Sequence, residues 1–467
     1  MKKIIALLLG IILAVSFISC AKEEEGEIIG GEKSPYKAED TALKSENYSF
    51  SRAEVSYAFY QNYNDLKYSN QESLDMYNID TSRSLKDQVY YDDVTWFSYI
   101  ADMTVEYMNN LLVLLEAAKA EGMTLTEEEM ETVEENVKAY KEYAKNYDYT
   151  EAEFFVYLFN YDVTADVIRS YMEKEALAFK YYNTVLDSYE FADDDLSAHV
   201  EENRGTFYYV DYIAYTFDEG KDGDALEAAD EAAKITDAAA FDQYILSHKA
   251  KVKNVSEDEV DTEDCHYIHR IYDEYSEFSK WAYSDEAKDG MTFKDYDEVD
   301  GEYKVYFLKK APYKEDYVTK NIRYIVTKVE THITADKAKA HAEDLLEQWK
   351  AGEATEHSFG ELAYNESEDT NSNLKGGLVE GVSKYQEGIP SDMIKWLFEE
   401  ERSAGDTGIF KQTGYYYTVY FVSDGDLKWK EDATASMRAE KYNAYQDELF
   451  KKYSVEKIDE VINSIDA

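Results

Sequence analysis

A long segment occurs twice in this chain, and it limits the fold more than any other feature of the sequence. The two copies span residues 209–308 and 321–422. Each opens on an apolar strand-like run, continues through a helical stretch rich in Ala, Lys, Asp and Glu, and closes on an alternating strand-like run. Equivalent positions keep nearly the same offset throughout, as at Tyr212 and Tyr324 in the opening runs. A period this long indicates a duplicated α/β domain and not a solenoid.

The beginning of the chain has the pattern of a secretory signal. Lys2 and Lys3 precede an apolar run at 4–17, which is too short for a permanent membrane span. The tetrapeptide FISC that follows within 1–20 resembles a bacterial lipobox, with Phe where Leu is usual. The resemblance implies that Cys20 becomes the lipidated first residue of the mature protein. The alternative is an ordinary signal peptide with Cys20 merely nearby.

Lipidation would place the protein on the outer face of a bacterial cell membrane. Acyl chains contribute ~0.8 kcal/mol per buried methylene, so several chains on Cys20 would hold it to a bilayer. The polar residues 21–46 are then expected to form a flexible tether. Once Cys20 is acylated, Cys265 is the one remaining thiol, and no internal disulfide can form.

The charge of the chain restricts its partners. The sequence holds 99 acidic against 49 basic residues, for a formal net charge of −50. Nucleic acids and anionic membrane surfaces are bound by Lys and Arg, so we expect no nucleic-acid partner. The acidity fits either a role in solubility or the binding of basic clients.

Both ends of the chain are helical by pattern. Residues 47–205 contain long helical periods, and two capping-box spacings mark helix starts, one at Thr126 with Glu129 and one at Thr150 with Glu153. The last segment, 426–467, is amphipathic and needs a partner surface, which the N-terminal helices offer. The expected fold class is α+β and multidomain: a helical module built from both chain ends, with two α/β repeats inserted.

The second copy carries an ordered set of landmarks. They are the opening strand 323–326, an FxxLA element, the loop SEDTNS before paired glycines, a helix, and a Gly-Tyr-Tyr before the last strand: Phe359, Leu362, Ala363, Ser367 to Ser372, Gly376, Gly377, Met393 to Phe398, Gly414, Tyr415 and Tyr416. This set resembles the parvulin class of peptidyl-prolyl isomerases, and the whole arrangement resembles the exported PrsA and SurA foldases.

The resemblance implies a domain layout. Residues 47–205 would be the N-terminal chaperone region, and 206–312 a degenerate parvulin-like repeat. Residues 316–425 would be the isomerase repeat, and 426–467 a C-terminal helix that packs on the N-terminal module. The resemblance also implies no cofactor, because isomerisation needs neither a nucleophile nor a metal.

The second copy departs from the family at its catalytic positions. The two strand histidines of parvulins correspond here to Tyr324 and Tyr416, and the loop residue to Asp369. The resemblance implies that these three residues form the catalytic set. It also implies a proline pocket, whose substrate-binding residues are Ile389, Met393 and Phe398.

Loss of both imidazoles leaves two readings open. The barrier of about 20 kcal/mol to rotation comes from amide resonance, and a site lowers it by binding the twisted bond better than the planar one. An apolar shelf and a polar group near the carbonyl suffice in principle, and tyrosine hydroxyls with Asp369 supply such a group. The second repeat is therefore either a weak or retained isomerase or an inactive fold. In the first copy Tyr212 and Glu302 take the two histidine positions, which favours a non-catalytic role.

The sequence holds one other group of residues that could bind a metal. Cys265, His266 and His269 lie close in sequence, but zinc sites use four ligands or three plus water, and no second cluster is nearby. We therefore predict no metal site.

Two main hypotheses follow. The first is an exported foldase that isomerises prolyl bonds in secreted proteins. The second is a holdase that binds unfolded polypeptides through the helical module and inert repeats. A surface adhesin or solute-binding lipoprotein is a third possibility, for which no motif is present. Expected partners are unfolded or proline-containing secreted polypeptides and, through the anchor, a membrane. The sequence leaves open whether the protein forms a homodimer.

Overall fold

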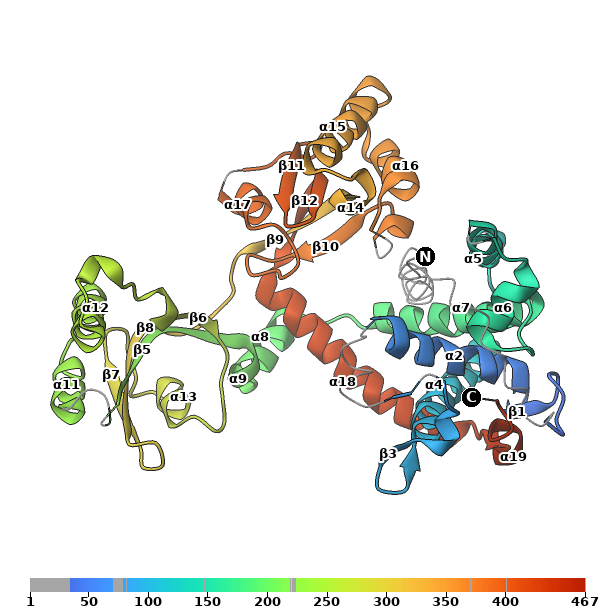
Figure 1. The fold of residues 1–467 in the computed structure, drawn as a ribbon, viewed down its shortest axis with the longest axis horizontal. Helices are drawn as coiled ribbons and strands as arrows, with labels where there is room; N and C mark the ends of the chain where they lie inside the picture. Colours follow the sequence, from blue (N-terminus) through green and yellow to red (C-terminus); the bar gives the residue numbers. More distant parts are fainter. Residues whose placement is uncertain are drawn as a thin grey trace. The chain divides into compact units, whose positions relative to one another are not determined.

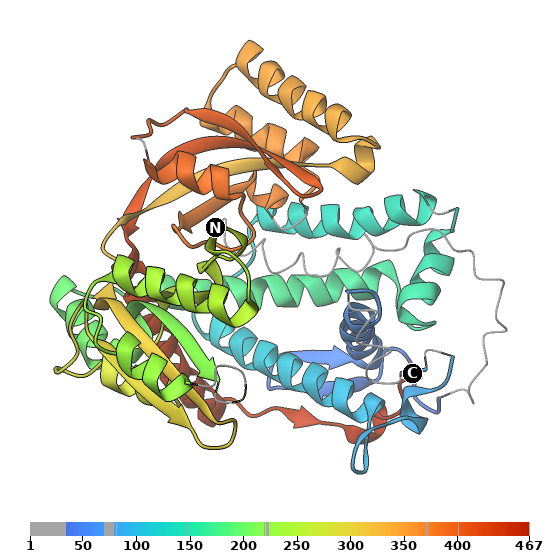
Figure 2. The same ribbon diagram turned by 60° about the vertical axis from the view of Figure 1, so that its left-hand side comes forward.

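The computed structural model describes residues 34–69, 79–80, 82–146, 148–218, 220, 224–369, 372–399 and 401–466. It combines helices with several small antiparallel sheets, as the α+β class predicts (Figures 1 and 2). The chain divides into two compact units. One contains residues 1–190, 320–423 and 438–467, and the other contains residues 191–319 and 424–437. The expected signal peptide and Cys20 lie outside the described residues.

The helical part of the first unit comes from both ends of the chain. Its helices are α2 (Arg52–Ser69), α4 (Trp96–Ala120), α5 (Glu127–Asn146), α6 (Glu151–Phe159), α7 (Ala165–Ser188), the later part of α18 (Lys428–Lys452) and α19 (Asp459–Ile462). Its short strands are β1 (Thr41–Lys44), β2 (Ser49–Ser51) and β13 (Glu456–Lys457), in the order β13-β1-β2, and the hairpin β3 (Val89–Tyr91) and β4 (Val94–Thr95).

Both predicted capping boxes start helices at the expected places. At α5, the Glu129 backbone N–H donates to the Thr126 hydroxyl, and the Thr126 N–H donates to the Glu129 carboxylate. Thr150 and Glu153 make the same reciprocal pair at the start of α6. Each box satisfies two backbone donors that the first helical turn leaves without partners.

One hydrophobic core joins the two ends of the chain. Tyr442 and Leu449 of α18 and Val461 and Ile462 of α19 are buried in the same cluster as the inward faces of α2, α4 and α7. Complete burial of a side chain of this size contributes about 1.5–3 kcal/mol. The C-terminal helix therefore does pack on the N-terminal helices.

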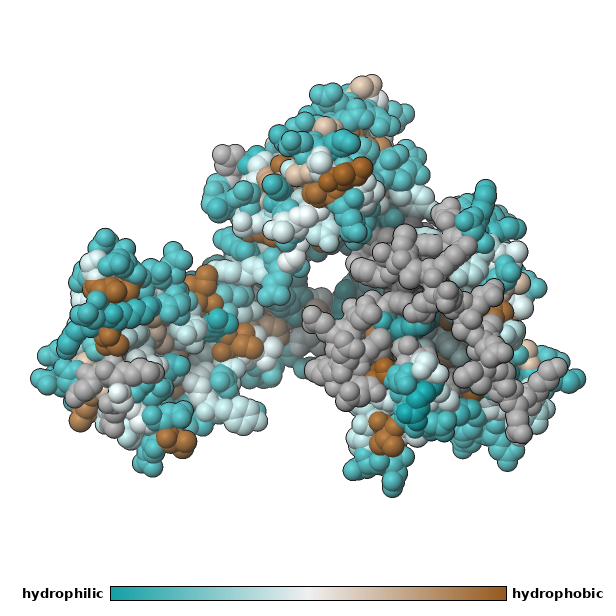
Figure 3. Space-filling view, in the orientation of Figure 1, coloured by the Kyte–Doolittle hydropathy of each residue, from teal (hydrophilic) through white to brown (hydrophobic). Residues whose placement is uncertain are grey.

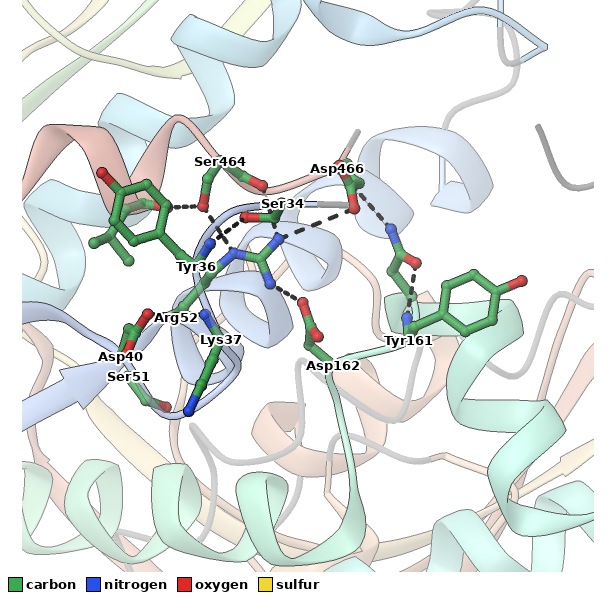
Figure 4. Close-up of polar contacts among 12 residues, drawn as sticks. Ser34, Tyr36, Lys37, Asp40, Ser51, Arg52, Tyr161, Asp162, Ser464 and Asp466 are labelled. Atoms are coloured by element: carbon green, nitrogen blue, oxygen red, sulfur yellow. Dashed lines mark hydrogen bonds and ion pairs between the residues drawn. The ribbon is translucent and has the colours of Figure 1, made fainter. Parts of the chain in front are cut away.

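A buried arginine adds a polar tie between the ends. Arg52, at the start of α2, donates to the Ser464 hydroxyl at 2.8 Å and to the Ser464 carbonyl at 2.7 Å. It also forms an ion pair with Asp162, and Figure 4 shows these groups converging on its guanidinium. A buried charge is stable only when its donors are used, so this cluster holds the C-terminal residues in place.

The tether expectation is wrong at its C-terminal end. Residues 41–44 form β1, which pairs with both β2 and β13, and Ala42 and Leu43 are fully buried. The strand was missed because its apolar run is only two residues long and its partner β13 comes from the other end of the chain. Residues 21–33 of the expected tether lie outside the described residues.

The first repeat forms a four-stranded sheet in the second unit. The strands are β5 (Tyr208–Asp218), β6 (His266–Arg270), β7 (Thr292–Asp297) and β8 (Glu302–Lys314), in the order β6-β5-β8-β7. The helices of this unit are α8 (Asp193–Glu202), α9 (Arg204–Phe207), α11 (Ala225–Ala232), α12 (Ala238–Lys253), α13 (Glu277–Ala282) and the first turns of α18, and the short 3-10 turns are η2 (Glu257–Glu259) and η3 (Glu263–Cys265).

The predicted domain boundary at 205 is placed too late. Leu196 and Val200 of α8 pack on Trp429 and Ala433, at the beginning of α18, within the second unit. Residues 191–205 and 424–437 therefore belong with the first repeat. Helical periodicity could not show this, because it reports a buried face without naming the surface that buries it.

The second repeat repeats the strand order of the first. Its strands are β9 (Val318–Lys328), β10 (Leu378–Val382), β11 (Thr407–Gln412) and β12 (Tyr415–Leu427), in the order β10-β9-β12-β11. Its helices are α14 (Val329–His332), α15 (Ala335–Ala351), α16 (Glu356–Glu366) and α17 (Ser391–Glu399), with the 3-10 turn η4 (Asn373–Lys375). In both repeats the second and third strands are edges, and the first and last strands pair in the centre.

The sheet of the second repeat is covered on both faces (Figure 1). Leu345 of α15 and Phe359 of α16 pack on one face together with Ile325. Met393 and Leu397 of α17 pack on the other face. The candidate site lies on the α17 face. No helix in the described stretches is long and apolar enough to cross a membrane.

Candidate functional site

The site is built around Tyr324, in the central strand β9. The backbone N–H of Tyr324 donates to the Gly377 carbonyl at 2.9 Å. Gly377 has φ +69°, and a Cβ at this position would lie 2.1 Å from the Tyr324 carbonyl oxygen. Only glycine permits both the left-handed backbone and this close approach. The paired glycines therefore fix the position of Tyr324.

Arg323 holds the glycine turn from the opposite face of β9. Its guanidinium donates to the carbonyl oxygens of Lys375 and Gly376 at 2.8 and 2.9 Å, and to Glu356 at 3.1 Å. Because neighbouring side chains on a strand point to opposite faces, Arg323 supports the loop without entering the Tyr324 side.

Asp369 lies in the loop after α16, and among the described residues it accepts hydrogen bonds from Tyr324 and Ser372. The Tyr324 hydroxyl donates to Asp369 Oδ2 at 3.1 Å, and the Ser372 hydroxyl and backbone N–H donate to the same oxygen at 2.5 and 3.2 Å. Burial, with the nearby Asp369 carboxylate as a second cause, raises the pKa of Tyr324. Tyr324 therefore keeps its proton and acts as a donor.

The three predicted pocket residues lie beside Tyr324. Met393 forms the floor of the apolar cluster and is fully buried, whereas Ile389 and Phe398 are half-buried at its margin. Two lysines stand near the Phe398 ring, with Lys320 Nζ 5.8 Å and Lys384 Nζ 5.9 Å from its centre. A ligand could contact Ile389 and Phe398 directly, while Met393 supports them from below.

Tyr416 does not belong to this set, which corrects the predicted site. Its ring is buried on the other face of the sheet, against Ala338 and Ala342 of α15. The next residue, Tyr417, faces Tyr324 instead, with ring centres 5.5 Å apart at 76°. Three consecutive tyrosines made the register ambiguous, and a shift of one residue moves a strand side chain to the opposite face. The alternation of Tyr417, Val419 and Phe421 on one face carried the signal that resolves it.

The corresponding place in the first repeat is filled by aromatic rings. Tyr212 stacks on Tyr267, with centres 4.9 Å apart at 15°, and its edge meets Phe278 at 4.7 Å. Phe278, on α13, in turn stacks on Tyr306 at 4.1 Å and 6°. Among the described residues, no hydrogen bond joins the Tyr212 hydroxyl to a carboxylate. Burial, as the largest cause, raises the pKa of Tyr212, and the charge of the exposed Asp273 adds to this shift.

Glu302 also lies away from its predicted position. It starts β8 and is opposite Asp218, whereas Tyr212 is opposite Leu308, six residues farther along the ladder. At about 3.3 Å per residue this offset is roughly 20 Å. Tyr306 is the β8 residue that faces Tyr212, with ring centres 5.8 Å apart.

The cysteine and histidines considered for metal binding use other partners. His266 Nε2 is 2.9 Å from Asp242, and His269 Nε2 is 3.2 Å from Glu315. Burial, as the largest cause, raises the pKa of the Cys265 thiol to about 11. Within the described ranges, no three His, Cys, Asp or Glu side chains come together as metal ligands.

Comparison with models of known families finds no match for this chain, and a search of curated proteins finds none either. The assignment of function therefore depends on the geometry and on the resemblance carried by the second copy.

Proposed function

We propose that this chain is an exported foldase of the parvulin type, in which a helical chaperone module carries two inserted parvulin-like repeats. The second repeat binds proline-containing segments of secreted polypeptides and catalyses their cis-trans isomerisation. The observation that carries the proposal is the hydrogen-bonded pair of Tyr324 and Asp369 at the margin of the apolar cluster around Met393.

This pair can assist rotation without a cofactor. When the prolyl bond twists, resonance is lost and the nitrogen becomes a better hydrogen-bond acceptor. The Tyr324 hydroxyl can then donate to the substrate, while the two donors of Ser372 remain on Asp369. Because this bond forms best in the twisted state, it lowers the barrier and does not merely tighten binding.

The apolar margin serves the proline ring. Ile389 and Phe398 offer half-buried surface next to Tyr324, and the fully buried Met393 keeps them in place. Binding energy from the ring orients the peptide bond against the Tyr324 hydroxyl.

A holdase activity is the second candidate. The first repeat fills its equivalent place with aromatic rings, so its contribution is binding or spacing. The helical module exposes tyrosine side chains at α6, and exposed aromatic rings suit loose recognition of unfolded chains. We further propose that Cys20 anchors the protein to the outer face of a bacterial cell membrane, where such clients emerge.

An isomerase assay tests the enzymatic proposal. Cis-to-trans rates on proline tetrapeptides would be measured with the full chain, with Tyr324→Phe and with Asp369→Ala. Removal of a donor to the transition state should lower kcat/KM by roughly a hundredfold in Tyr324→Phe, and Asp369→Ala should act through the lost orientation of Tyr324. The matched control is Tyr416→Phe, which removes a hydroxyl on the opposite face of the same sheet.

The outcomes separate the two candidates. A wild-type rate equal to that of solvent leaves the holdase as the function. A wild-type rate above solvent that is unchanged in Tyr324→Phe would place catalysis elsewhere.

A further inference from the structure

An exposed pair of tyrosines lies at helix α6: Tyr149 precedes the helix, and Tyr157 lies within it. Phe154, Phe155, Leu158 and Phe159 are buried, whereas Tyr149 and Tyr157 are 38% and 46% exposed. The two rings stack, with centres 5.7 Å apart at 20°. Two stacked and exposed rings offer a rigid aromatic surface that a partner side chain can contact.

A fixed carboxylate shares this side of the helix. Glu153 lies one turn before Tyr157, at the spacing that places two side chains on one face. Its Oε2 accepts from the Thr150 hydroxyl at 2.6 Å and from the Thr150 N–H at 2.9 Å. The Thr150 hydroxyl, as the largest cause, lowers the pKa of Glu153, so the carboxylate stays charged. Among the described residues, no Lys or Arg forms an ion pair with it.

The surroundings add negative charge. The neighbouring helix α5, which packs on α6 through Tyr140 and Phe155, contains seven Glu and three Lys. Glu129 and Glu134 of α5 pair with Lys180 and Arg169, and Lys141 of α5 pairs with Glu151 of α6. A third tyrosine, Tyr161, follows α6 and is 62% exposed, and its ring points away from the Arg52 cluster in Figure 4. Figure 3 shows the strongly apolar residues in small separate groups on the face it displays.

We propose that Tyr149, Glu153 and Tyr157 form a site for an arginine or lysine side chain of an extended polypeptide. The guanidinium or ammonium group stacks on the tyrosine rings and pairs with the Glu153 carboxylate. Arginine fits better than lysine because its planar group can stack and form a two-pronged bond at once. The net negative charge of α5 attracts the rest of a basic segment over a longer range.

The inference rests on the proposed binding role of the helical module and names the chemistry of its clients. A client segment would combine basic residues with an extended conformation. An acidic segment would be repelled by the same surface, so the site selects among unfolded chains.

Fluorescence anisotropy with the full chain tests the site. The probe is a labelled extended peptide that contains three arginines, and its partner has glutamine at the same three positions. We expect the arginine peptide to bind at least fivefold more tightly, with the difference shrinking as salt is raised. Equal binding of the two peptides would overturn the proposal.

Variants locate the binding. Tyr149→Leu with Tyr157→Leu keeps apolar bulk but removes the rings, and Glu153→Gln keeps the capping geometry but removes the charge. Exposed cation–π and ion pairs are individually weak, so each change should reduce affinity by roughly two- to fivefold. The matched control is Tyr275→Leu in the first repeat, a more exposed tyrosine at 87%, which should leave binding unchanged. Unaltered affinity in both α6 variants would sink the idea.

Two readouts keep this test apart from that of the proposed function. Prolyl isomerisation is measured on uncharged peptides, so its absence does not affect arginine binding. Loss of arginine selectivity with isomerisation intact would reject the α6 site alone. Thermal unfolding of each variant, expected to match wild type, shows that the helix remains folded.

Discussion

The two repeats share a strand order but differ in what occupies the space beside their first strand. In the first repeat, Tyr212 is enclosed by Tyr267, Phe278 and Tyr306. In the second repeat, the loop with Asp369 reaches Tyr324, and a hydroxyl-carboxylate pair remains at the margin of a smaller apolar cluster. The same framework therefore supports either a filled core or a polar site, and the loop before the paired glycines decides between them.

The two repeats share packing contacts that lie farther from Tyr212 and Tyr324. Trp281 packs on Phe293 at 5.4 Å, and the equivalent Trp396 packs on Phe410 at 5.3 Å. Phe241 and Phe359 are both fully buried on the opposite face of their sheets. Large rings at equivalent positions therefore stabilise both sheets. The two repeats differ at the helix residue that packs on the central strands, which is Phe278 on α13 in the first repeat and Met393 on α17 in the second.

The largest effect is expected for Phe278→Ala. Removal of this ring leaves a cavity among Tyr212, Tyr306 and Phe293, which typically costs about 3–5 kcal/mol. Hydrogen exchange should become faster in β5 and β8 and remain unchanged in β9 and β12. Undisturbed exchange in β5 would contradict the view that rings fill this place.

A slightly smaller loss is expected for Gly377→Ala in the second repeat. The new Cβ meets the Tyr324 carbonyl and the backbone is left-handed, so the turn must move at a cost of about 2–4 kcal/mol. Gly414→Ala is the control, since its φ is +83° but nothing lies within 4 Å of the added Cβ. It should cost only about 1 kcal/mol, and equal losses in urea unfolding would show that close approach is unimportant.

Phe398→Ala should act on binding more than on stability. The ring is half-buried at the margin of the cluster, so its loss should raise KM about fivefold while kcat changes little. Steady-state isomerase kinetics measure both constants. A larger change in kcat than in KM would assign Phe398 to the transition state.

Tyr306→Phe should give the smallest effect, seen only in alkali. Burial raises the pKa of Tyr306 to about 12, with nearby Tyr212 as a lesser cause. A tyrosine whose pKa is raised by folding stabilises the fold fully below about pH 10, and this contribution is lost as pH rises through the folded pKa. Between about pH 10 and about pH 12 the variant should therefore lose less stability than wild type. Parallel alkaline losses in urea unfolding would mean that Tyr306 does not titrate as part of the ring cluster.

Sequence patterns predicted the helices and strands better than they predicted which elements pair or pack with one another. The duplication predicted two α/β domains of the same kind, and the capping boxes at Thr126 and Thr150 marked helix starts because capping is a local signal. Tyr416 was misplaced because three adjacent tyrosines carry no alternation, and only the buried Val419 and Phe421 define the face. The strand at 41–44 escaped notice because its stability depends on pairing with residues near 457. Strand pairing between residues so far apart in the sequence produces no periodic pattern in either segment.

The Arg52 cluster has a consequence for the order in which the chain can fold. Arg52 and Ser464 are bonded although 412 residues separate them. A ribosome releases the N-terminal helices long before residues 459–464, so part of the apolar surface of the helical module stays uncovered during synthesis. Closing so long a loop is also entropically demanding. The helical module is therefore complete only after both repeats have been synthesised and α19 and Ser464 have reached Arg52.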